Sequence, residues 1–194
     1  MENTSEIKFS ETVVLIDSAF LNFVIRDVKA YFEESLQRPL CKIDLSVLIT
    51  CLLLDAGLKE GENSIHVLMV YDKLSSRLLN CIPADLVKEL DGVAFQSICG
   101  ECLFSSITSE EMVSRGDLFI ELLSIVLNSK DVKKVVIIPF VEEYEEKVIK
   151  VLNDSEDKEI FQFRMNEPNI PVKYRWDMLA FPVMHALGIK SDEL

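Results

Sequence analysis

The sequence predicts an α/β three-layer sandwich with a mostly parallel central sheet, and three observations indicate this fold class. Two short apolar runs, at Thr12–Asp17 (TVVLID) and residues 135–140 (VVIIPF), are rich in Val and Ile, as strands buried on both faces are. A segment with helical spacing of apolar residues follows each run. Strands and helices then alternate along the chain, which is typical of parallel sheets with right-handed crossovers.

The first third of the chain is expected to hold one strand and two helices. Thr12–Asp17 is the strand, and apolar residues at helical spacing predict a helix over residues 19–36. Asp44 is then placed as the N-cap of a strongly apolar helix over residues 45–58. Two glycines near the end of that helix mark where it stops.

The middle of the chain is expected to add more strands. Residues 65–71 form the second strand, and Pro83 is predicted to open a short helix that runs to Leu90. Residues 93–98 are a third strand, which Gly100 and Glu101 turn into a hairpin with residues 103–107.

The last part of the chain contains the remaining helices and strands. Thr108 and Glu111 match a capping box, so a helix is expected to start near Ser109 and to kink or restart at Gly116. The second half of this helix is expected over residues 118–127. It is followed by a strand at residues 135–138, a helix at residues 142–152 and a final strand at residues 160–165.

The length of 194 residues predicts a single α/β domain over residues 1–194, with a flexible tail at residues 1–10. Residues 166–194 are expected to form a loop followed by an apolar segment. No apolar run reaches the roughly 18 residues of a membrane span, and no secretory signal is visible at the N-terminus. The five cysteines favour a reducing compartment, so we expect a cytoplasmic protein without membrane contact.

The net charge of −13, from 20 basic and 33 acidic residues, counts against nucleic acid as a partner. The densest basic group, around Lys133, is interrupted by Asp131. Cys99 and Cys102 form a Cys-x-x-Cys motif, but a zinc site needs four ligands at short spacing, so a structural role is preferred for these thiols.

Acidic residues follow the predicted strands, where the carboxyl ends of parallel strands meet at one edge of the sheet. Asp17, Asp72 and the pair Glu142 and Glu143 follow strands, and Asp117 begins a helix. Converging carboxylates could hold Mg²⁺ or Mn²⁺, which would activate water for attack on a phosphodiester. The alternative is that these acids cap helices and solvate loops.

The order TVVLID, IDLSVL, HVLMVYD, RGDLFIELL and VVIIPFVEEYEEKVI resembles the NYN branch of the PIN-like nucleases over residues 12–165. This resemblance implies a metal site at acidic positions matched by Asp17, Asp117 and Glu143, and Tyr144 matches the aromatic position of the last motif. The chain departs from the pattern elsewhere. The family has asparagine where Phe20 stands, and acids near Leu123 and at Val141.

Two hypotheses follow from the resemblance. One is a metal-dependent ribonuclease-like enzyme that uses Asp17, Asp117 and Glu143, assisted by Asp72 or Glu142. The other is a non-catalytic relative that acts as a binding or interaction module. The missing motif positions and the negative charge favour the second hypothesis.

The apolar stretch at residues 176–189 must be covered, because Asp177 is its only charged side chain. It either packs back on the chain's own core or contributes to a homodimer. Pro182 is expected to bend any helix that forms there.

Overall fold

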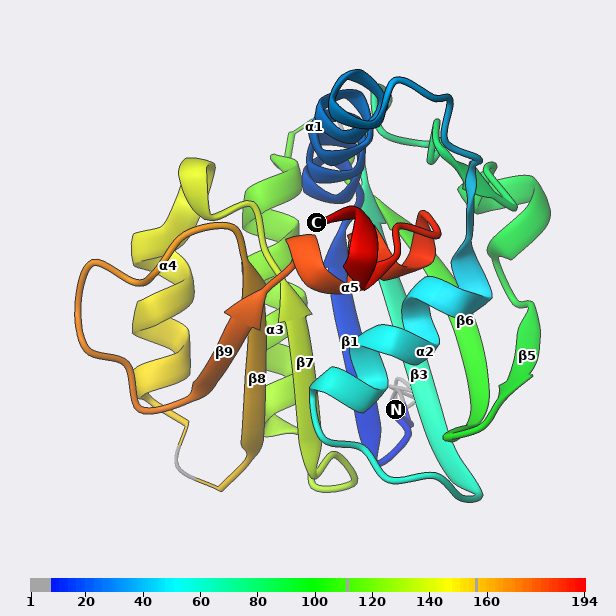
Figure 1. Cartoon of the computed structure of the whole chain (residues 1–194). Helices are drawn as coiled ribbons and strands as arrows, with labels where there is room; N and C mark the ends of the chain where they lie inside the picture. Colours follow the sequence, from blue (N-terminus) through cyan, green and yellow to red (C-terminus); the bar gives the residue numbers. More distant parts are fainter. Residues whose placement is uncertain (1–7, 111, 156) are drawn as a thin grey trace.

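The computed structural model describes residues 8–110, 112–155 and 157–194. A seven-stranded sheet forms the middle layer of these residues, in the order β5-β6-β3-β1-β7-β8-β9, and β5 is its antiparallel strand (Figure 1). The short strands β2 and β4 pair separately. The bounds are β1 Thr12–Asp17, β2 Ile43–Asp44, β3 Asn63–Tyr71, β4 Cys81–Ile82, β5 Ala94–Ser97, β6 Gly100–Thr108, β7 Lys134–Ile138, β8 Glu159–Arg164 and β9 Arg175–Met178.

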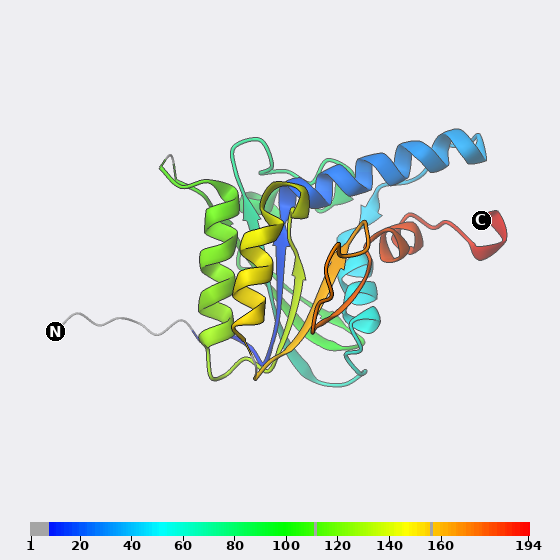
Figure 2. The same ribbon diagram turned by 90° about the vertical axis from the view of Figure 1, so that its left-hand side faces the viewer.

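Helices cover both faces of the sheet, so the chain has three layers (Figure 2). Side chains alternate along β1, so Val14 and Ile16 pack on one helical layer while Val13 and Leu15 pack on the other. The first layer consists of α1 (Ser18–Leu36), α2 (Leu45–Asp55) and α5 (Ala180–Ala186), and the second of α3 (Arg115–Asn128) and α4 (Val141–Asn153). The α/β class and the mostly parallel central sheet are therefore confirmed.

The two apolar runs lie side by side in the middle of the sheet, as predicted. β1 pairs with β7 in parallel, from Thr12 with Lys134 to Ile16 with Ile138. All residues of both strands are buried, because helices cover each face. Their consecutive apolar residues are thus explained by burial on two sides.

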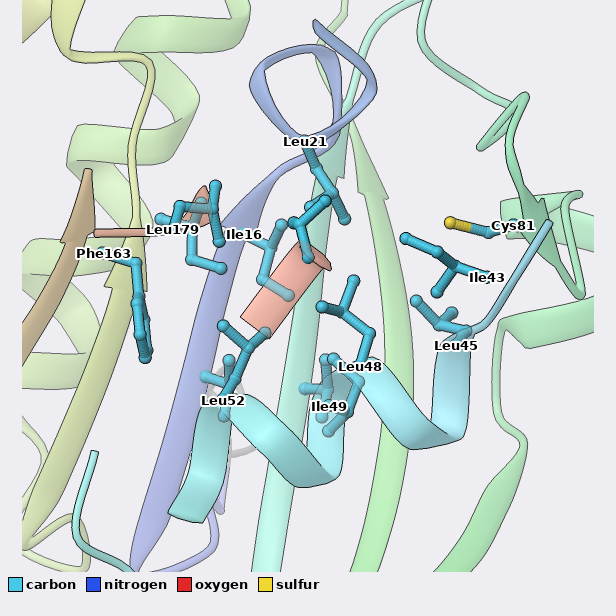
Figure 3. Close-up of a cluster of buried hydrophobic side chains, with 14 of the residues drawn as sticks. Ile16, Leu21, Ile43, Leu45, Leu48, Ile49, Leu52, Cys81, Phe163 and Leu179 are labelled. Carbon is cyan, nitrogen blue, oxygen red and sulfur yellow. The ribbon is translucent and has the colours of Figure 1, made fainter. Parts of the chain in front are cut away.

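The strongly apolar helix α2 packs on the sheet and against α5. Leu48 and Leu52 of α2 point toward Ile16 of β1 in Figure 3, and Leu179 lies beside them. All four side chains are fully buried, with 0% of their surface exposed. The outer face of α2 also carries apolar side chains, since Val47 is 40% and Leu54 is 39% exposed, so the helix has no clear polar stripe.

Two predicted helix starts are wrong, and local hydrogen bonds show why. The Pro83 peptide is cis, and the short π-helix Leu86–Leu90 begins after Asp85, whose carboxylate accepts hydrogen bonds from two following amides. Thr108 ends β6 instead of capping a helix, and Glu111 lies outside the described residues. Helix α3 begins at Arg115, because the Ser114 hydroxyl oxygen caps the Asp117 amide at 3.0 Å.

The predicted N-terminal tail is too long at its inner end. Residues 1–7 lie outside the description, but Phe9 is buried against the α3 side of the sheet, and its ring lies 5.9 Å from that of His66. Glu11 accepts backbone hydrogen bonds from Lys133 and Lys134, which ties this segment to the start of β7.

The C-terminal region contains a strand that the sequence analysis missed. β9 extends the sheet by pairing in parallel with β8, so β8 is not the last strand. Helix α5 follows directly and packs on α1 and α2. Pro182 lies in its first turn, where an amide hydrogen has no helical partner, so the proline is tolerated.

The apolar C-terminal stretch is largely covered by the chain itself. Leu179 and Val183 are 0% exposed, while Phe181 is 56% exposed. This is the intramolecular packing that the sequence analysis offered as one option. A homodimer stays a prediction, with Phe181 as a large apolar side chain of this stretch that is exposed. Within the described ranges, none of the helices combines the length and apolarity that crossing a bilayer requires.

Candidate functional site

The centre of the sheet has a topological switch point beside β1. The chain leaves β1 through α1 and enters β3 on one side, while β7 pairs with the other side of β1. In open parallel sheets, ligands bind outside the carboxyl ends of the strands at such a point. A ligand site is therefore expected at the residues that follow β1, β3 and β7.

Asp17 is the last residue of β1, and both of its carboxylate oxygens are engaged. Oδ1 accepts hydrogen bonds from the amides of Ala19 at 3.0 Å and Phe20 at 3.2 Å, so Asp17 caps α1. Oδ2 accepts from Arg115 Nε at 2.8 Å and from the Tyr144 hydroxyl at 2.7 Å. The carboxylate is 0% exposed, and these four donors satisfy it.

Arg115 begins α3 and joins three acidic side chains through three different nitrogens. Nε contacts Asp17, Nη1 contacts Asp72 at 2.5 Å, and Nη2 contacts Glu143 at 2.6 Å. The guanidinium also lies over the ring of Phe140, 5.6 Å from its centroid. Burial lowers the pKa of Arg115, but the three carboxylates outweigh burial and raise that pKa above its ordinary value.

Asp72 is held in position by the turn that follows β3. Its Oδ1 accepts from the amides of Leu74 at 2.9 Å and Ser75 at 3.0 Å, and from the Ser75 hydroxyl at 2.9 Å. Burial raises the pKa of the Asp72 carboxyl, but the hydrogen bonds from Ser75 and Arg115 lower it by more. The net pKa is below the ordinary value, so Asp72 is ionised at neutral pH.

Tyr144 supplies the fourth donor to Asp17 from a kink in α4, where its backbone departs from helical geometry. Its hydroxyl donates to Asp17 and accepts from the amide of Phe140 at 3.0 Å. Burial and the negative charge of Asp17 both raise the pKa of the phenol, so it stays a protonated donor.

Gly116 is required for the close packing of α3 against Tyr144. A Cβ at this position would lie 2.7 Å from Tyr144 Cδ1, and the ring cannot withdraw without breaking its bond to Asp17. We expect Gly116→Ala to lower the free energy of unfolding by about 1–3 kcal/mol, as overpacking does. Urea unfolding measures this loss.

The matched control for Gly116→Ala is Glu121→Ala, at an exposed position of the same helix. It should change stability by less than about 0.5 kcal/mol, as surface substitutions usually do. Alanine is intrinsically favoured over glycine in helices by up to about 1 kcal/mol. A Gly116→Ala protein as stable as the wild type, or more so, would contradict the packing requirement.

Two of the five predicted site residues lie outside the contacts of Arg115. Asp117 accepts a hydrogen bond from the Ser114 hydroxyl at 2.8 Å and pairs with Lys147 at 2.6 Å, and Lys147 is the main cause of its lowered pKa. Glu142 is exposed in the first turn of α4. The structure thus brings Asp17, Asp72 and Glu143 together, and it places Asp117 and Glu142 beside them on the surface.

An open cleft of about 920 Å³ lies over this network. We call it the carboxyl-edge cleft. Its walls are the loops that follow β3 and β6 and the first turns of α3 and α4, and Arg115 and Tyr144 contribute to its floor. The lining also includes Leu74, Glu110, Val113, Asp117, Glu143 and Lys147.

Comparison with known protein families finds a match to the sequence of this chain. Residues 6–194 match the family of unknown function DUF6621. The chain belongs to that family. No curated protein and no solved structure matches it.

The network of this DUF6621 member does not fit the predicted Mg²⁺ or Mn²⁺ ion. Each oxygen of Asp17 already accepts two hydrogen bonds, and the guanidinium of Arg115 occupies the point where the carboxylates converge. Across the part of the chain that the structure describes, no group of three or more His, Cys, Asp or Glu side chains is arranged to hold a metal ion. An ion at this point would have to displace Arg115.

The Cys-x-x-Cys motif lies at the turn between β5 and β6, away from the cleft. Both Cys99 and Cys102 are buried in the core cluster that contains α2. Burial raises the pKa of the Cys102 thiol to about 11, so it is protonated at neutral pH. The geometry agrees with a structural role for these thiols.

Arg115 is central to the site but was not among the predicted site residues. Two features of the sequence could have indicated its role. Asp17 ends a strand that had to be buried on both faces, and a buried carboxylate requires donors or a counter-charge. Arg115 lies two residues before the predicted helix residue Asp117, so it was a candidate for that counter-charge.

Proposed function

We propose that this protein is a non-catalytic binding module whose fold is related to the NYN branch of the PIN-like nucleases. The observation that carries the proposal is the contact of one guanidinium, that of Arg115, with three carboxylates at 2.5–2.8 Å. The resemblance implies a catalytic metal at acidic positions in this region, and here an internal cation holds the acids instead.

The chemistry of a metal-dependent nuclease would require those acids to be available. A divalent cation needs several oxygen ligands, and it activates water only when it keeps open positions for water and substrate. Arg115 pairs with the three acids through hydrogen bonds of fixed direction, and it offers no position for water to be activated. The net charge of −13 also opposes a phosphate-rich substrate.

The same network suits a preformed binding surface. Asp72 and Tyr144, which line the carboxyl-edge cleft, are each held by more than one hydrogen bond, and Tyr144 is anchored to the buried Asp17, so this part of the cleft is rigid. A cleft of this size at the switch point of a parallel sheet is the usual position of a ligand site. Binding without chemistry uses the cleft and leaves the ion network intact.

The alternative is a metal-dependent phosphodiesterase, and one observation favours it. Asp17, Asp72 and Glu143 come from three separate segments and still converge at the carboxyl ends of β1, β3 and β7. In this alternative, a metal ion and substrate together displace Arg115 and take over the carboxylates.

Calorimetric titration with Mn²⁺, alongside an assay for cleavage of single-stranded RNA, separates the two functions. We expect no saturable Mn²⁺ binding up to millimolar concentration and no cleavage. Binding together with cleavage, both lost in Asp17→Asn, would overturn the proposal. Glu143→Gln is the second variant, because Glu143 is 49% exposed and its replacement leaves Asp17 and Tyr144 in contact.

A further inference from the structure

Two neighbouring loops expose large apolar side chains at the carboxyl-edge cleft. Leu74 in the loop after β3 is 96% exposed, and Val113 in the loop after β6 is 40% exposed. β3 and β6 pair up to Tyr71 and Thr108, so the two loops leave the sheet side by side. Isolated exposed apolar residues need no explanation, but two on adjacent loops of one cleft indicate a contact surface.

The lining of the cleft carries a small excess of negative charge. Four acidic and three basic side chains line it. Arg115 pairs with Asp72 and Glu143, and Lys147 pairs with Asp117. Glu110 is exposed, and Glu143 is half-exposed although it contacts Arg115. A ligand that enters the cleft therefore meets apolar side chains beside carboxylates.

The charge of the whole chain selects among the possible occupants. A second copy would bring a further net charge of −13, and nucleic acid or an anionic membrane would also add negative charge. Complementary potential favours a positively charged partner, both in the rate of encounter and in the discrimination against other surfaces.

We infer that the carboxyl-edge cleft binds a basic peptide segment of another protein that carries large apolar side chains. This inference rests on the proposed binding function and names its partner class. Lysine or arginine side chains of the segment pair with Glu110 and Glu143, and its apolar side chains pack on Leu74 and Val113. Exposed charge pairs of this kind weaken with salt, so binding falls as ionic strength rises.

Fluorescence anisotropy with a labelled 12-residue peptide, made of three Leu-Lys-Lys-Ser repeats, tests the inference on the full chain. We expect saturable one-to-one binding. Two altered peptides should not bind: one in which every Leu is replaced by Ser, and one in which every Lys is replaced by Glu. In the protein, Leu74→Ser with Val113→Ser, and separately Glu110→Gln with Glu143→Gln, should each weaken binding by about tenfold.

The controls carry the same chemical changes outside the cleft. Leu79→Ser removes an exposed leucine that does not line it, and Glu60→Gln with Glu62→Gln removes two exposed acids at the opposite edge of the sheet. Both controls should bind as the wild type does, and melting curves confirm that every variant is folded.

Three results would overturn the inference. They are the absence of saturable peptide binding, an equal loss of affinity in the cleft variants and the controls, and tighter binding of a single-stranded oligonucleotide than of the peptide. The proposed function would survive the first two, because the Mn²⁺ titration and the RNA assay test it separately.

Discussion

Replacing Arg115 by methionine is expected to lower the free energy of unfolding by about 3–5 kcal/mol, the usual result of removing one partner from a buried ion pair. Methionine keeps much of the length of the side chain and removes its charge. Asp17, which is 0% exposed, then loses its counter-charge but keeps the hydrogen bond from Tyr144. Asp72 and Glu143 lose the cation that holds them near Asp17. Urea unfolding at neutral pH measures the change.

The Arg115→Met protein should also respond to divalent cations in a way that the wild type does not. Three carboxylates remain around the position that the guanidinium leaves, and hard cations take such oxygen ligands. Millimolar Mn²⁺ should therefore raise its melting temperature, because an ion that binds only the folded state stabilises it.

Lys147→Met is the matched control for Arg115→Met. It removes the cation of an ion pair whose side chains are both more than half exposed, so it should cost less than about 1 kcal/mol. If Arg115→Met were no more destabilising than this control, the three-carboxylate network would contribute little to stability, and the rigid floor of the cleft would lose its support.

Ending the chain after Tyr174 is expected to abolish cooperative folding. The truncation removes β9, which pairs with β8, and α5, which packs on α1 and α2. Leu179, Val183, Leu187 and Ile189 are buried at 8% exposure or less. Burial of one such side chain stabilises by about 1.5–3 kcal/mol, so the loss is comparable with the 5–15 kcal/mol of a typical domain.

A chain that ends after Lys190 is the control for this truncation. It removes only the last turn and the exposed ion pair between Arg38 and Glu193, which contributes about 1 kcal/mol or less. Circular dichroism and thermal melting compare the two chains. A cooperative transition in the chain that ends after Tyr174 would show that the C-terminal segment is dispensable for the core.

The sequence by itself determined the central sheet and most of its helices. Runs of consecutive apolar residues at Thr12–Asp17 and in β7 require cover on both faces, so only a buried parallel sheet satisfies them. Helix α1 follows from the spacing of its apolar side chains, and Asp44 caps α2 as predicted, through the amide of Ser46. These features depend on residues that are close together in the chain, which is why they can be predicted locally.

The start of α3 is set locally, because the Ser114 hydroxyl oxygen accepts a hydrogen bond from the Asp117 amide. The tertiary structure alone decided the existence of β9 and the composition of the site. β9 forms because β8 offers an edge to pair with. The positions of acids at the ends of predicted strands indicated that these side chains would converge. No sequence pattern indicated which cation pairs with them. Asp17 and Arg115 are 98 residues apart, and only folding brings that charge beside a carboxylate with no access to water.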